Sequence, residues 1–226
     1  MGLALADVAW PDAARTACAV LAVPIGATEQ HGPHLPLTTD TDIAGALVRG
    51  LAEARPDVVA APPLAYGSSG EHAGFDGTLS IGREAVELVM VELVRSASHT
   101  FRRVLLVCAH GGNEAPLSRA EQRLRAEGRD VRAWLPRWFG DAHAGRLETS
   151  LMLAIAPERV ALVRAAAGER APLVELMPRL VAAGVRAVSP NGVLGDPAGA
   201  SAAEGRALLA AEIARLAEAI DEWPAR

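Results

Sequence analysis

The 226-residue chain has few cysteines and few aromatic residues: two cysteines, four tryptophans, three phenylalanines and one tyrosine. Both cysteines, Cys18 and Cys108, lie in apolar runs, where a free, buried thiol in a reducing compartment is the usual interpretation. Metal binding through cysteine is therefore not expected. We predict a cytoplasmic protein.

The sequence also lacks long apolar runs and any excess of basic charge. Its longest apolar stretches are too short to span a bilayer, and residues 1–17 lack a basic start followed by a hydrophobic core. The formal net charge is −5, arginine dominates the cations, and no basic stripe is visible. We therefore expect neither a membrane segment nor a nucleic-acid partner.

What is present is typical of a globular domain. Half of the residues are hydrophobic and 22% are charged, which excludes broad disorder. A chain of this length can bury a full core, and neither a repeat nor a linker stands out. We predict a single domain over residues 1–226.

Apolar runs alternate with segments of helical periodicity. Strands are predicted at 17–25, at 57–67 with a break at Pro62 and Pro63, at 102–110 and at 130–135. Helices are predicted at 41–54, 80–98, 113–126, 148–156 and 201–223. Thr39 or Thr41 is expected to cap the first helix, and Leu88 and Val89 are expected on the apolar side of the second. This alternation predicts an α/β fold: a three-layer αβα sandwich with a mostly parallel central sheet.

The densest group of metal-capable side chains follows the first predicted strand. The segment GATEQHGPHLPLTTDTD, residues 26–42, contains Glu29, His31 and Asp40. In extended backbone, residues i and i+2 project to the same side, so Glu29 and His31 can face one cavity. Imidazole and carboxylate together suit zinc, iron or manganese, whereas calcium or magnesium would call for oxygen ligands alone. Asp40 is a candidate bridge between two ions.

Two further segments carry such side chains past the ends of strands. His110 ends the strand predicted at 102–110, and His143 and Glu148 follow the strand at 130–135. In open parallel sheets, ligands bind outside the carboxyl ends of the strands, so three segments distant in sequence are expected to meet at one edge. Two metal ions held there can activate water and polarise a carbonyl, which is the chemistry of amide hydrolysis.

Other polar residues are better explained by structural roles. His34, between two prolines, is expected to shape its loop or support a ligand, and Asp42 to complement a helix dipole. His72, in a glycine- and serine-rich segment at 67–82, is expected to be exposed, and His99 to be a cation at the C-terminal end of a helix. No GxSxG elbow, Walker loop or GxGxxG follows a predicted strand, so serine-hydrolase and nucleotide-binding chemistry are not supported.

Several of these segments together resemble the creatininase family of metal-dependent amidohydrolases. The segment at 24–42, PIGATEQHGPHLPLTTDTD, is similar to the family signature. AHGGN at 109–113, HAGRLETS at 143–150 and GVLGDPAGAS at 192–201 are similar to further motifs. The resemblance spans nearly the entire chain. Within the family, GEHAGFDGTLSIG at 70–82 and the compact length look most like the peptidases of the mycofactocin system.

The resemblance implies a binuclear site with zinc, iron(II) or manganese. The ligands that it implies are Glu29 and His110 on one ion, His31 on the other, and Asp40 between them. Creatininase itself has a metal-binding glutamate two positions after the histidine that corresponds to His110, and this chain has Gly112 there. We predict that Glu148 supplies the missing carboxylate.

The resemblance also implies a reaction. A metal-bound hydroxide would attack an amide near the C-terminus of the modified precursor peptide and release a cyclised fragment built from its terminal Val-Tyr pair. His143 is expected either to protonate the leaving nitrogen or to orient Glu148, and both are candidate catalytic residues.

Two alternative functions stay open. One is a hydrolase of creatinine or of formamide-like amides, for which Trp134, Trp138 and Phe139 are the aromatic residues placed to line a small pocket. The other is a non-catalytic protein that binds metal or peptide. A closed homo-oligomer is implied by the resemblance, with apolar surface expected at 161–188 and 201–222.

Overall fold

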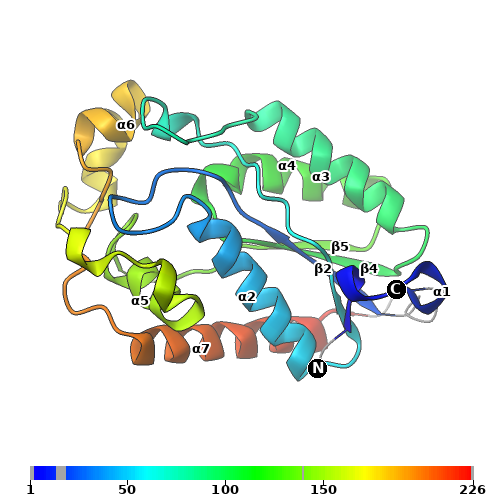
Figure 1. Cartoon of the computed structure of the whole chain (residues 1–226). Coiled ribbons are helices and arrows are strands. Elements are labelled where there is room, and N and C mark those ends of the chain that lie inside the picture. The colour runs from blue at the N-terminus through cyan, green and yellow to red at the C-terminus, as the bar shows by residue number, and fades with distance from the viewer. Residues whose placement is uncertain (1–2, 14–18, 139, 225–226) are drawn as a thin grey trace.

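The structure, a computed structural model, describes residues 3–13, 19–138 and 140–224 (Figure 1). Its centre is a five-stranded sheet in the order β1-β3-β2-β4-β5, and all neighbouring strands are parallel. The strands are β1 (Leu3–Ala4), β2 (Val20–Ile25), β3 (Val58–Ala60), β4 (Arg103–Cys108) and β5 (Val131–Trp134). The prediction of a parallel α/β sheet is confirmed.

Helices cover both faces of this sheet. They are α1 (Trp10–Ala13), α2 (Thr39–Ala54), α3 (Arg83–Ala97), α4 (Glu114–Ala126), α5 (Arg146–Ile155), α6 (Leu173–Val188) and α7 (Ala202–Asp221). Short 3₁₀ turns are η1 (Leu5–Asp7), η3 (Gly70–His72), η4 (Gly111–Asn113), η5 (Pro157–Arg159) and η6 (Leu162–Arg164). Helices α2, α5 and α7 pack on one face and α3 and α4 on the other, which gives three layers (Figure 1).

Strand β2 explains why the core has two halves. Val20 and Ala22 belong to the cluster under α2, α5 and α7, whereas Leu21, Val23 and Ile25 belong to the cluster under α3 and α4. Successive side chains of a strand point to opposite faces, so a strand covered on both sides is apolar throughout. All six residues of β2 are buried. Each large aliphatic side chain buried in this way stabilises the fold by about 1.5–3 kcal/mol.

The predicted start of α2 was wrong, whereas the predicted break of the second strand at Pro62 and Pro63 is confirmed. Helix α2 already begins at Thr39, so neither Thr39 nor Thr41 is its N-cap. Strand β3 ends at Ala60 because Pro62 and Pro63 follow, and proline has no N–H to donate to a ladder.

The predicted buried face of α3 was also wrong. Val86, Met90 and Val94 are buried, whereas Leu88 and Val89 are 53% and 41% exposed. Both faces of this helix carry apolar residues, so periodicity alone could not select the one that packs on the sheet.

Helix α6 has no counterpart in the predicted elements. It contains Pro178 and is kinked at Gly184, where φ is 73°, and both residues interrupt the helical pattern of the sequence. Its outer face leaves Val174 and Val181 exposed. The C-terminal helix does not offer the apolar surface that was expected there, because α7 packs its apolar side on α2 and α5.

Two smaller predictions concern thiols and membranes. Cys108 is a free, buried thiol as predicted, and burial raises its pKa to about 12. Cys18 lies outside the described residues. Within the described ranges, no helix is both long enough and apolar enough to cross a membrane.

Helices α5 and α7 approach each other so closely that one position requires glycine. A Cβ atom on Gly205 of α7 would overlap the carbonyl oxygen of Ser150 and lie 3.0 Å from the Cβ atom of Ala154. Because Glu148 lies in the first turn of α5, this helix contact also holds a candidate site residue in place.

We expect Gly205→Ala to lower the free energy of unfolding by about 1–3 kcal/mol, because a rotamer change cannot relieve a clash with backbone. This cost exceeds the gain of about 1 kcal/mol in helix propensity. Gly45→Ala in α2 is the control, since its Cβ would meet only the flexible end of Arg49, at 3.1 Å. Urea denaturation measures both variants. A wild-type midpoint for Gly205→Ala would contradict the packing argument.

Candidate metal centre

The five predicted metal ligands come together at the carboxyl edge of the sheet. They are Glu29 and His31 after β2, Asp40 in the first turn of α2, His110 after β4, and Glu148 in the first turn of α5. The first four residues are at most 4% exposed. Their atoms form two groups of three that share Asp40, and within each group the candidate ligand atoms lie within 4.8 Å of one another.

The first group consists of Glu29, Asp40 and His110. Nε2 of His110 lies 2.9 Å from the carbonyl oxygen of Ser68, which can only accept, so this nitrogen carries the proton. Nδ1 is the nitrogen that can bind a cation once the ring has lost its second proton, and it lies 3.2 Å from Oδ2 of Asp40. Oε2 of Glu29 is also close to this ring, 3.3 Å from Nε2.

The second group consists of His31, Asp40 and Glu148. Nδ1 of His31 donates to the carbonyl oxygen of Glu29 at 3.2 Å, so Nε2 is the nitrogen that can bind a cation once the ring has lost its second proton. Nε2 lies 3.1 Å from Oδ1 of Asp40 and 3.8 Å from Oε2 of Glu148. The two oxygens of Asp40 therefore face two different imidazoles.

Two carboxylate oxygens in this cluster test whether the residues fit a metal. Oε2 of Glu29 and Oδ2 of Asp40 are buried, and neither has a hydrogen-bond partner in the described part of the chain. A buried acceptor without a donor is costly, and a cation would remove that cost. The nitrogen and oxygen donors suit zinc, iron or manganese. The residues fit a pair of divalent ions.

The charged groups of the cluster shift one another's pKa values. Burial would lower the pKa of His31, but neighbouring carboxylates, first that of Asp40, raise it to about 10. The pKa of His110 is raised to about 10 against the effect of burial, chiefly by Glu29. The pKa of Asp40 stays well below its usual range because the two imidazoles outweigh burial. Burial raises the pKa of Glu29 to about 8. Without metal, protons balance the buried carboxylates.

Two more histidines line the cluster, and one of them was predicted wrongly. His72, expected to be exposed, is buried, and its Nε2 lies 3.3 Å from Oε1 of Glu29. The ring of His143 lies between those of His72 and His31, with centroids 4.4 and 4.3 Å away. Burial, followed by the charge of His31, lowers the pKa of His72 to about 3 and that of His143 well below its usual value. Both rings are therefore neutral.

The segment at 67–82 is closer to the site than its polarity indicated. Ser68 and Ser69 are buried, and Oε1 of Glu71 lies 3.8 Å from Nε2 of His110. A Cβ atom on Gly112 would overlap the carboxylate of Glu71, the ring of His110 and the carbonyl of Ser68. No side chain fits at Gly112 in this arrangement. Glu71 was not predicted at the site, although the GEHAGF segment that contains it carries part of the family resemblance.

Glu148 is held by the turn that precedes α5. Its Oε2 accepts a hydrogen bond from the backbone N–H of Ala144 at 2.5 Å, and burial raises its pKa. Ala144 has a φ of 53°, the left-handed region that non-glycine residues rarely adopt. Such strain often occurs next to functional residues, and Ala144 directly follows His143.

His34 and Asp42 have the structural surroundings that were predicted. Nε2 of His34 contacts the hydroxyl of Thr149 at 2.9 Å. Asp42 lies in the first turn of α2 and pairs with Arg159 at 2.8 Å.

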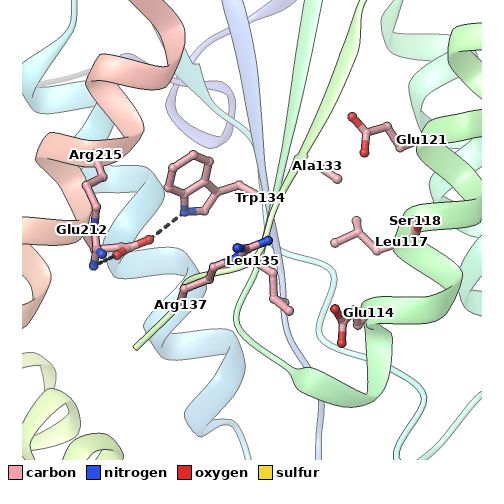
Figure 2. Close-up of a pocket in the computed structure, with 10 residues that line it drawn as sticks. All are labelled: Glu114, Leu117, Ser118, Glu121, Ala133, Trp134, Leu135, Arg137, Glu212 and Arg215. Atoms are coloured by element: carbon pink, nitrogen blue, oxygen red, sulfur yellow. Dashed lines mark hydrogen bonds and ion pairs between the residues drawn. The ribbon is translucent and has the colours of Figure 1, made fainter. Parts of the chain in front are cut away.

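A separate cavity of about 600 Å³ lies between α4, β5 and α7, and its lining includes neither group of candidate ligands (Figure 2). Trp134, expected to help line a small substrate pocket, instead donates from Nε1 to the buried Glu212 of α7 at 2.7 Å (Figure 2). Trp138 packs against the core under α2, α5 and α7. Phe139 lies outside the described residues. Trp134 therefore lines this separate cavity and not a small-substrate pocket at the candidate ligands.

Comparison with known proteins identifies the family. The family described as "Creatininase: Creatinine amidohydrolase" matches residues 6–220. A curated protein of Mycolicibacterium smegmatis, "Mycofactocin precursor peptide peptidase", is 50% identical over 208 residues, which cover 89% of this chain and 84% of that protein.

Solved structures give the same result for the fold. "Creatininase Mn" and a mutant creatininase of the "Zn-Zn type" each have a TM-score of 0.83, with 25% identity and full coverage of both chains. Those two descriptions name manganese and zinc. The family match extends over nearly all of the sequence, and the curated relative shares half of its residues over most of both chains. The chain therefore belongs to the creatininase family.

Proposed function

We propose that this chain is a metal-dependent peptidase that cleaves an amide near the C-terminus of the modified mycofactocin precursor peptide, releasing the cyclised Val-Tyr-derived fragment. The observation that carries the proposal is the pair of ligand groups that share Asp40, in a chain 50% identical to a mycofactocin precursor peptide peptidase. The family match supports the reaction type, and the 50% identical relative supports the substrate class.

In this proposal each chain holds two divalent ions, zinc, iron(II) or manganese. The ligands are Glu29, Asp40 and His110 for one ion, and His31, Asp40 and Glu148 for the other. When bound, such a pair polarises a carbonyl as a Lewis acid and lowers the pKa of a water ligand. The manganese and zinc named for solved creatininases support this choice of ions.

The chain's own residues determine how the peptide is approached and how protons move. Among the carboxylates of the cluster, the side chains of Glu71 and Glu148 are 30% and 17% exposed, so the substrate enters from their side. Nε2 of His143 donates to the carbonyl oxygen of Gln30 at 2.8 Å, which leaves Nδ1 bare. His143 therefore accepts the proton of the attacking water at Nδ1 before it protonates the leaving nitrogen.

We also propose a single cytoplasmic domain that assembles into a closed homo-oligomer. The exposed apolar residues of α6, including Val174, Met177 and Val181, form a surface suited to contact with another subunit.

Substrate class can be tested directly on the reconstituted protein. After anaerobic loading with zinc, iron(II) or manganese, we expect cleavage of the modified precursor peptide and no turnover of creatinine, measured by mass spectrometry. Turnover of creatinine alone would identify a small-amide hydrolase. Failure to hydrolyse either substrate with two ions bound would identify a non-catalytic binding protein.

Metal content tests the sharing of Asp40. Asp40→Ala should lose both ions and all detectable activity, because Asp40 faces both imidazoles, whereas Glu148→Gln should lose mainly one ion. Asp42→Asn is the control, since Asp42 lies in the same helical turn but pairs with Arg159. Elemental analysis after gel filtration measures the stoichiometry. Two ions retained by Asp40→Ala would rule out the bridge, and two retained by Glu148→Gln would remove Glu148 as a ligand.

Metal affinity should depend on pH because metals and protons compete for the same nitrogens. With the pKa values of His31 and His110 raised to about 10, both imidazoles are protonated at pH 7 in the metal-free protein. Binding must then release about one proton from each imidazole and one from Glu29, whose pKa of about 8 keeps it protonated at pH 7. Apparent affinity should rise about tenfold per pH unit for each proton until the pH reaches the pKa of that group. Calorimetry in two buffers of different ionisation enthalpy counts the protons. Binding without proton release would contradict this electrostatic description.

A further inference from the structure

Gln30 lies between two candidate ligands, yet the proposed reaction leaves its side chain without a role. This side chain is buried, and its Oε1 accepts from the backbone N–H of Gly32 at 2.9 Å. Its Nε2 donates to the carbonyl oxygen of Gly192 at 3.1 Å. A backbone N–H only donates and a carbonyl only accepts, so these two contacts fix the orientation of the amide.

The loop at 189–201 is built around this amide. Gly192 has a φ of 80°, and a Cβ atom there would overlap the side-chain amide of Gln30. The same loop pairs with the catalytic segment, because the backbone of Leu194 exchanges hydrogen bonds with that of His143. Gln30 therefore joins the segment at 24–42 to the loop at 189–201.

The backbone of Gln30 sets the tautomer of His143. As described above, Nε2 of His143 donates to the carbonyl oxygen of Gln30, so it cannot also accept from the amide nitrogen of Gln30, 3.0 Å away. The two amide hydrogens are thus left for the other two neighbours of that nitrogen. One neighbour is the carbonyl of Gly192, and the other is Nδ1 of His72 at 2.8 Å.

The tautomer of His72 follows from the same contact. Because Nδ1 of His72 accepts from Gln30, its proton lies on Nε2, which faces Oε1 of Glu29 at 3.3 Å. This contact occupies one oxygen of Glu29. The other, Oε2, is the buried atom without a hydrogen-bond partner that lies near His110.

We propose that Gln30 is a positioning residue that holds His72 in the Nε2-protonated tautomer and so directs Oε2 of Glu29 toward a metal ion. The effect on metal binding rests on the proposed ligand role of Glu29, whereas the tautomers do not. The same amide contacts Gly192 in the loop at 189–201, so the position of this loop affects the geometry of the metal centre. His143 keeps its own tautomer through the backbone of residue 30, independently of the side chain.

Nitrogen-15 NMR of histidine-labelled, metal-free protein tests the tautomers without any enzymatic assay. In the wild type, we expect His72 and His143 each to carry a proton on Nε2 alone. In Gln30→Met, which keeps the length of the side chain but removes its donor, His72 should become a mixture of tautomers while His143 stays unchanged. Gln122→Met on the exposed face of α4 is the control, with both signals as in the wild type. A proton on Nδ1 of wild-type His72, or an unchanged His72 in Gln30→Met, would overturn the proposal.

Zinc affinity, measured by competition with a chelator, tests the coupling to the metal centre. For Gln30→Met we expect affinity at one of the two sites to fall by about 10–100-fold, the effect usual for groups that orient a ligand. Unchanged affinity at both sites together with a changed His72 would overturn the coupling. If Gln30→Met fails to fold, the wild-type tautomers decide. A wild-type protein that cleaves no peptide but shows these tautomers would reject the proposed function and leave this inference intact.

Discussion

The buried carboxylate of Asp40 is the constraint around which the site is arranged. Its two oxygens lie 3.1 and 3.2 Å from imidazoles that come from different strands, His31 after β2 and His110 after β4. A carboxylate buried this completely is costly unless positive charge compensates it. Two protonated imidazoles do so in the metal-free protein, and two divalent ions can replace their protons.

The sheet and its helices bring these charges to one edge. Strands β2 and β4 are adjacent and parallel, so the segments that follow them begin at the same edge. Asp40 and Glu148 then enter from the first turns of α2 and α5, where carboxylates are favoured by the helix dipole. The contact of α5 with α7 at Gly205 fixes one of these turns.

Around this centre, glycines provide the space that polar side chains occupy. Gly112 leaves room for the carboxylate of Glu71 beside His110, and Gly192 leaves room for the amide of Gln30. Both positions would clash with any side chain. At Gly112, a carboxylate from another segment, that of Glu71, thus approaches His110.

The sequence by itself determined the parallel α/β sheet and the segments that meet at its edge, because strand apolarity and the 24–42 motif are local features. It predicted Glu29, His31, Asp40, His110 and Glu148 as candidate ligands, and the structure brings these five together. Only the tertiary structure decided which face of α3 is buried, that α6 continues past Pro178, and that His72 and Glu71 reach the cluster. These outcomes depend on contacts between segments far apart in the chain. A pattern within one segment cannot specify which neighbour covers it, since that depends on how the whole chain packs.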